Sequence, residues 1–180
     1  MIIAQQKKKE NIAEYVLYMF QIEDMMRACN NDIEIVKSKI IAQYNQPPEV
    51  MKNIEYWYEN ILALMKNEGV EKKGHLQEVL NIIDDMADVH LRLLRSPLHP
   101  DYKAAYQDAV PVIGQSLQLT KREGASEIEI CLEMLYMILL LKLQHKEISN
   151  DTTYAISKIS KLLAILSAKY KLNEEDKLDY

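Results

Sequence analysis

Apolar residues recur at helical spacing along almost the whole chain, and this periodicity restricts the fold more than any other feature of the sequence. No convincing stretch alternates between apolar and polar residues, as a half-buried β-strand does. Residues that cap or end helices separate the periodic segments, with Asp32, Ser126 and Ser149 as candidate N-caps. Pro111 should kink or split the helix in which it lies. The pattern predicts about seven helices, roughly over residues 8–29, 32–44, 48–67, 74–95, 100–122, 126–147 and 150–170. The sequence therefore predicts an all-α fold.

A chain of 180 residues is long enough to bury one substantial apolar core. We expect a compact single-domain helical bundle over residues 1–172, followed by a frayed acidic tail at 173–180. The segments 8–29 and 126–147 are apolar around most of the helix circumference, so these two helices should be the most buried.

The net charge and the lengths of the apolar runs limit the kinds of partner that the chain can have. The 22 basic and 27 acidic residues give a net charge of −5, which argues against broad nucleic-acid binding. The longest uninterrupted apolar run, Met134 to Leu141, is far shorter than the ~20 residues that span a bilayer. No targeting segment is visible, and two cysteines make no disulfide framework. We expect a cytoplasmic protein with no nucleic-acid partner, no membrane association and no cofactor.

An acidic cluster on the predicted helix 74–95 is a pattern typical of metal chemistry. Asp84, Asp85 and Asp88 match the DDxxD spacing with which all-helical prenyl-diphosphate enzymes hold Mg²⁺ against a diphosphate. Asp84 and Asp88 are four residues apart and share one helix face. Asn81 and Arg92 lie on the same polar stripe, which favours a solvated surface. The metal site stays an alternative.

Charged residues on apolar helix faces suggest a second kind of site. Glu23 and Arg27 are four residues apart and lie beside Val16 and Met19. They predict either a polar pocket in which Arg27 fixes an anionic ligand, or an ion pair that sets helix register. His90 also falls on an apolar face and is either a buried base or ligand, or a core histidine bonded to one neighbour. The structural interpretation is preferred for all three.

Three consecutive aromatic residues, Tyr56, Trp57 and Tyr58, span about 200° of a helix and cannot share one face. We expect Trp57 in the core, near Ile54 and Ile61, and one of the tyrosines at the surface.

Several stretches carry a resemblance to a known family: QKKKENIAEY at 6–15, YMFQIED at 18–24, EIEIC at 127–131 and LLL at 139–141. Together they resemble an uncharacterised family of Bacteroidetes proteins, classed as a domain of unknown function, over nearly the full chain. The resemblance implies a bacterial, cytoplasmic, single-domain protein. It transfers no active site.

Taken together, these patterns favour a non-enzymatic protein-interaction module whose partner is another protein or a second copy of the chain. The chain has no reactive-centre motif, and its nine methionines suit an adaptable packing surface. The alternative is a Mg²⁺-dependent hydrolase or transferase that acts on a phosphorylated small molecule through Asp84, Asp85 and Asp88. A third possibility is a small-ligand binder with a pocket at Glu23 and Arg27.

Overall fold

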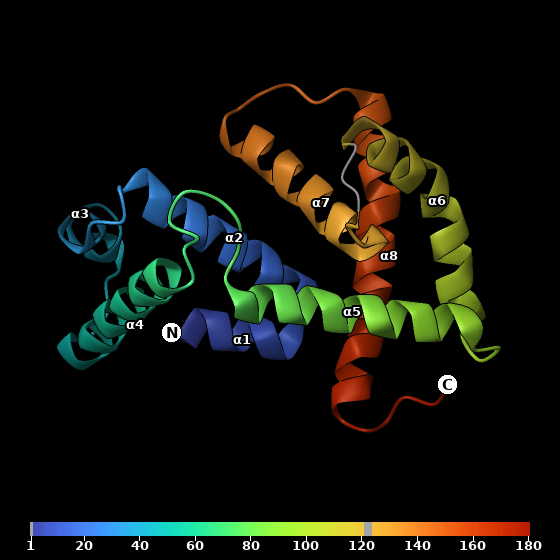
Figure 1. Ribbon diagram of the computed structural model, residues 1–180, viewed down its shortest axis with the longest axis horizontal. Coiled ribbons are helices and arrows are strands. Elements are labelled where there is room, and N and C mark those ends of the chain that lie inside the picture. The colour runs from blue at the N-terminus through green and yellow to red at the C-terminus, as the bar shows by residue number, and fades with distance from the viewer. Residues whose placement is uncertain (1, 121–123) are drawn as a thin grey trace. The chain divides into compact units, whose positions relative to one another are not determined.

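The computed structural model describes residues 2–120 and 124–180, which form eight α-helices and one 3-10 helix, without a β-strand (Figure 1). The helices are α1 Ile2–Glu10, α2 Ile12–Ala28, α3 Ile33–Lys39, η1 Ile41–Gln43, α4 Pro48–Asn67, α5 Gln77–Arg95, α6 Pro100–Thr120, α7 Glu127–Leu143 and α8 Asn150–Glu174. The predicted all-α fold is confirmed.

The chain divides into two compact units, which are described separately. The first unit comprises Met1–Gln6 and Tyr18–Leu80, and the second comprises Lys7–Leu17 and Asn81–Tyr180. Their boundaries fall inside α1, α2 and α5. The single domain expected over residues 1–172 stays a prediction.

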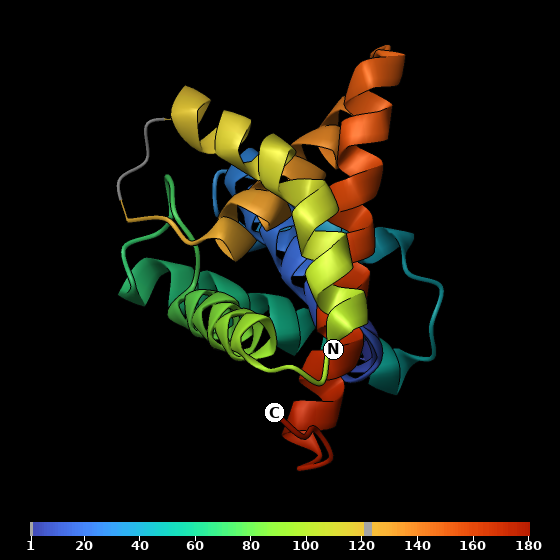
Figure 2. The ribbon, with the colours of Figure 1, turned by 90° about the vertical axis from the view of Figure 1, so that its right-hand side faces the viewer.

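In the second unit, α8 is the helix against which the others pack. Helix α6 runs alongside α8, and α7 contacts both (Figures 1 and 2). The buried side of α8 is apolar at helical spacing. It consists of Ile159, Leu162, Leu163, Leu166 and Tyr170, with Ser167 as its one polar member.

In the first unit, α3 and η1 pack against α4. The buried side of α4 is made by Ile54, Tyr58, Ile61 and Met65. The expectation that Trp57 belongs to this core is wrong: Trp57 is only partly buried, whereas Tyr58 is fully buried. Tyr58 continues the spacing of four, three and four residues that keeps side chains on one helix face, and Trp57 does not.

Side-chain caps begin three helices where the sequence predicts them. Asp32 accepts a hydrogen bond from the backbone N–H of Glu34 at 2.8 Å and starts α3. Ser126 starts α7 and Ser149 starts α8 in the same way, each with a bond of 3.1 Å to the third residue along. Such caps satisfy amide groups that have no partner inside the helix.

The first predicted helix, 8–29, is two helices. Helix α1 begins at Ile2, and α2 begins after Asn11, whose side chain accepts a hydrogen bond from the backbone N–H of Glu14 at 3.2 Å. Asparagine is a strong N-cap, and its polar side chain marks a break that apolar periodicity alone does not reveal.

Backbone conformation explains where two other helices differ from prediction. Helix α5 starts at Gln77 and not at 74, because Gly74 has a φ of +87° that no right-handed helix contains. Helix α7 ends at Leu143 and not at 147, because His145 has a φ of +54°. Helix α6 continues through Pro111, so the helix is not split there.

The C-terminal residues, expected to be frayed, make contacts within the second unit. Helix α8 extends to Glu174, and the hydroxyl of Tyr180 donates to Asn173 Oδ1 at 2.9 Å. The guanidinium of Arg92 lies 4.6 Å from the centre of the Tyr180 ring.

The two helices that were expected to be the most buried, α2 and α7, differ in how much of their surface is buried. Helix α2 has nine buried residues, from Ile12 to Met26, as predicted. Helix α7 is buried only in its first half and at Ile138. Most of its second half is only half-buried, and Met137 and Leu143 are 62% and 56% exposed, so the prediction is wrong there. In the described part of the chain, no helix combines the length and apolar character that crossing a bilayer requires.

Substitution by alanine should distinguish a buried leucine of α7 from an exposed leucine of α6. Leu132 is 0% exposed, whereas Leu119, at the end of α6, is 76% exposed. We expect Leu132→Ala to lower the free energy of unfolding by about 2–5 kcal/mol, because it leaves a cavity. Leu119→Ala should change it by less than about 0.5 kcal/mol. Urea denaturation measures both, and equal losses would contradict the packing described.

Candidate functional site

Glu23 is a fully buried carboxylate in the first unit. It lies on α2 with no exposed surface, and its Oε1 accepts the backbone N–H of Leu76 at 2.9 Å. Its Oε2 lies 2.6 Å from Nδ1 of His75, which donates because an ionised carboxylate only accepts. The His75 ring stacks on Phe20 with centroids 3.9 Å apart. Glu23 therefore holds the end of the connection between α4 and α5.

Arg27 holds the same connection from one turn further along α2. Its Nη1 donates to Asp24 Oδ1 at 2.8 Å, and its Nη2 donates to the carbonyls of Val70, at 3.1 Å, and of Gly74. Glu23 and Arg27 thus both bind the connection between α4 and α5, each through different partners. Spacing within one helix could point to Asp24, but no local signal points to His75, which is 52 residues from Glu23.

His90 belongs to the second unit, where it is 3% exposed and joins three helices. Its Nε2 lies 3.3 Å from Glu127 Oε2 on α7, and its Nδ1 lies 2.6 Å from the hydroxyl of Tyr102 on α6. Tyr106 donates to Glu127 Oε1 at 3.1 Å. Nε2–H of His90 donates to the carboxylate, and the Tyr102 hydroxyl is bonded to the other ring nitrogen, Nδ1. His90 therefore bonds to two side chains, and not to the single neighbour that the sequence predicts.

The protonation states in this cluster follow from its contacts. The hydrogen bond from His90, with that from Tyr106, lowers the pKa of Glu127 despite its partial burial. Burial raises the pKa of Tyr102, and burial together with the Glu127 bond raises that of Tyr106 to about 12. Burial also raises the pKa of the nearby Cys131 thiol to about 12, so it is no nucleophile at neutral pH. Because Tyr102 has no exposed surface, the geometry favours a structural tie.

The three aspartates of the alternative metal site lie on α5. Asp84, Asp85 and Asp88 are all exposed, as a solvated face predicts. Among the residues that the structure describes, no three His, Cys, Asp or Glu side chains are grouped so that they could hold a metal ion.

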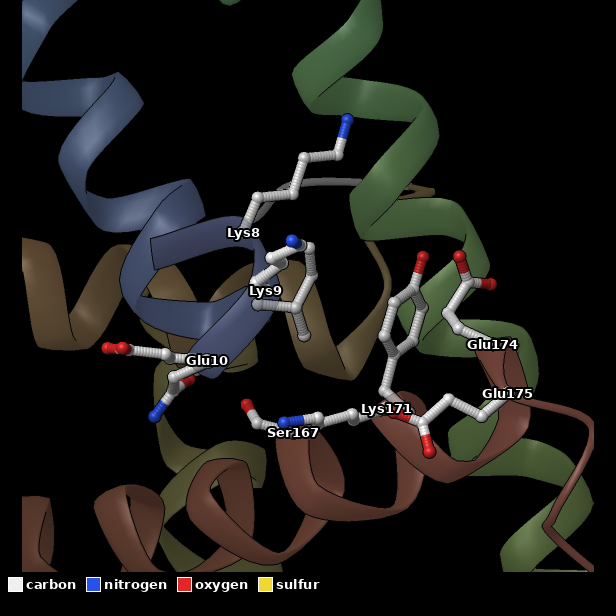
Figure 3. A pocket seen from close by; sticks show the side chains of 10 residues that line it. Lys8, Lys9, Glu10, Ser167, Lys171, Glu174 and Glu175 are labelled. Atoms are coloured by element: carbon white, nitrogen blue, oxygen red, sulfur yellow. The ribbon is translucent and has the colours of Figure 1, made fainter. Parts of the chain in front are cut away.

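A pocket of about 430 Å³ opens in the second unit between residues 8–12 and the last turns of α8 (Figure 3). Lysines and glutamates from both segments line it, together with three buried residues, Ile12, Ser167 and Tyr170. The Oγ of Ser167 accepts the backbone N–H of Ala13 at 3.4 Å, which fastens the start of α2 to α8. Sequence reasoning missed this pocket because its walls are more than 150 residues apart along the chain.

The second half of α7 carries an apolar surface. Met137 is mostly exposed, and Met134 and Leu141 are partly exposed. These residues are three and four positions apart, so they share one face. Next to the end of α7, a hollow of about 320 Å³ is lined by residues that include Ile138, and by Ile156 on α8.

Comparison with models of protein families gives a match over nearly the whole chain. A family model described as Domain of unknown function (DUF4924) matches residues 1–177. No curated protein and no solved structure matches the chain. The match covers nearly all of the chain and carries no activity with it.

Removing the charge of Glu23 should loosen the connection between α4 and α5. We expect Glu23→Gln to lower the free energy of unfolding by about 1–3 kcal/mol, because His75 loses its ionised acceptor. Amide exchange of residues 70–76 should also become faster. The exposed Glu49→Gln on α4 is the matched control. Unchanged stability and exchange in Glu23→Gln would contradict this role.

Acid should remove the stabilisation that Glu127 provides. Because folding lowers the pKa of this carboxyl from its ordinary 4.5, its contribution is present above pH 4.5 and is lost as the pH falls through the lower folded value. The stability difference between wild type and Glu127→Gln should therefore shrink below pH 4.5. Urea unfolding at a series of pH values measures it, with the exposed Glu147→Gln as control. A difference that grows on acidification would refute the assignment.

Proposed function

The chain belongs to the family described as Domain of unknown function (DUF4924), and on this premise we propose that it is a non-enzymatic protein-interaction module. The observation that carries the proposal is the apolar face on the second half of α7. We place the protein in the cytoplasm of a bacterium of the Bacteroidetes, in line with the resemblance of its sequence.

The character of the α7 face supports a protein partner. Met137 exposes 62% of its surface, and Met134 and Leu141, which share its helix face, are partly exposed. Removing apolar surface from water stabilises a complex by about 25 cal/mol per Å². Methionine side chains adapt to partners of different shape. A cluster of such residues on one helix is typical of an interaction site.

The spacing on α7 favours a helix as the bound element. Met134, Met137 and Leu141 repeat at intervals of three and four residues, which is the pattern of a seam between two packed helices. The exposed Lys142 and Gln144 lie beside this seam and can form a polar rim. The occupant that we propose is an amphipathic helix of another protein or of a second copy of this chain.

A charge placed in the seam should abolish association. We expect Met137→Glu to weaken self-association or partner retention by at least about tenfold, because a buried unpaired carboxylate is strongly unfavourable. Leu98→Glu is the matched control, since Leu98 is 56% exposed but lies in the connection between α5 and α6.

Light scattering over a range of concentrations measures self-association, and affinity capture with cross-linking measures partner retention. Support requires an association that Met137→Glu removes and Leu98→Glu keeps. A chain that stays at its monomer mass of 21.0 kDa and retains no protein would reject the proposal. An association that both variants keep would reject the α7 face as its site.

A further inference from the structure

The pocket between the start of α2 and the end of α8 has fixed walls. Ser167 is 4% exposed and Tyr170 is 7% exposed, and the hydrogen bond from Ala13 to Ser167 joins the two segments. Ile12, at 4% exposed, adds an apolar surface. A volume of about 430 Å³ is in the range of small-molecule sites.

One side of the pocket offers positive charge and hydrogen-bond donors. Lys9 and Lys171 are exposed, and neither forms an ion pair with any residue in the described ranges 2–120 and 124–180. Burial, together with the nearby Glu174 and Asp85, raises the pKa of Tyr170 to about 12, so its phenol stays protonated and can donate. The ammonium groups are suitable partners for a carboxylate, whereas the Tyr170 hydroxyl lies near Glu174.

The other side offers negative charge. Glu174 is exposed and has no ion-pair partner among the described residues, whereas Glu175 is paired with Lys177 at 2.8 Å. In Figure 3, the ammonium group of Lys9 and the carboxylate of Glu174 lie on opposite sides of the opening. Within the part of the chain that the structure describes, the pocket therefore presents two cations, Lys9 and Lys171, and one anion, Glu174, outside any ion pair, around a surface that is partly apolar.

We propose that this pocket binds a small zwitterion of the α-amino-acid class, with the ligand's carboxylate held by Lys9 and Lys171 and its ammonium group held by Glu174. A dicarboxylate would place one negative charge against Glu174, and a diamine would place a positive charge against the lysines. A zwitterion matches both sides, and its side chain can lie against Ile12. This inference is independent of the α7 face.

Binding is tested on the full chain with the twenty standard L-amino acids, each added at up to about 10 mM while amide resonances are followed by NMR. We expect at least one amino acid to shift resonances of residues 8–12 and 167–175. Its deaminated carboxylate and its decarboxylated amine should each bind at least about tenfold more weakly, because each lacks one charge.

Variants assign the two charges separately. The double substitution Lys9→Gln/Lys171→Gln should weaken the amino acid at least about tenfold and leave the amine unchanged. Glu174→Gln should weaken the amino acid and leave the carboxylate unchanged. Lys161→Gln, on an exposed position of α8 away from the pocket, should bind like the wild type. The proposal is overturned if no amino acid shifts these resonances, or if the carboxylate alone binds as tightly as the amino acid.

Discussion

The apolar stripe along α8 is the interaction on which the second unit depends. Ile159, Leu162, Leu163 and Leu166 are each at most 1% exposed, and both α6 and α7 pack against this helix (Figure 2). Burying one such side chain stabilises the fold by about 1.5–3 kcal/mol. Helix α8 has 25 residues, so it extends past its contacts with α7 and brings its last turns to residues 8–12. The pocket is thus a consequence of the length of α8.

Polar contacts fix the positions of helix ends that apolar burial alone does not determine. Apolar attraction has no direction, whereas a hydrogen bond fixes both distance and angle. In the first unit, Glu23 binds His75 and the amide of Leu76, so the start of α5 has one position on α2. In the second unit, Glu127 receives bonds from His90 and Tyr106, so the first residue of α7 is fixed to α5 and α6. Both carboxylates act where a connection meets a helix.

Local patterns predicted the local structure well. Asp32 and Ser126 cap the helices that their positions indicated, because an N-cap bond spans only two or three residues. Positive φ angles at Gly74 and His145 make two helices shorter than predicted. The end at His145 could not be predicted from the sequence, because histidine, unlike glycine, does not indicate a positive φ. Helix α7 was predicted to be one of the two most buried helices, yet Met137 is exposed. An apolar sequence allows burial, but it does not determine how many neighbouring helices cover it.

By itself, the sequence determined that this protein is all helical and where most of its helices begin, since both depend on spacing and caps within a few residues. It also identified Glu23, Arg27 and His90 as polar residues on apolar faces. Only the tertiary structure decided their partners, because His75, Tyr102 and Glu127 lie 12 to 52 residues away along the chain. The unpaired charges at the pocket and the uncovered face of α7 were decided in the same way, since each depends on which distant segments pack together and which surfaces they leave open.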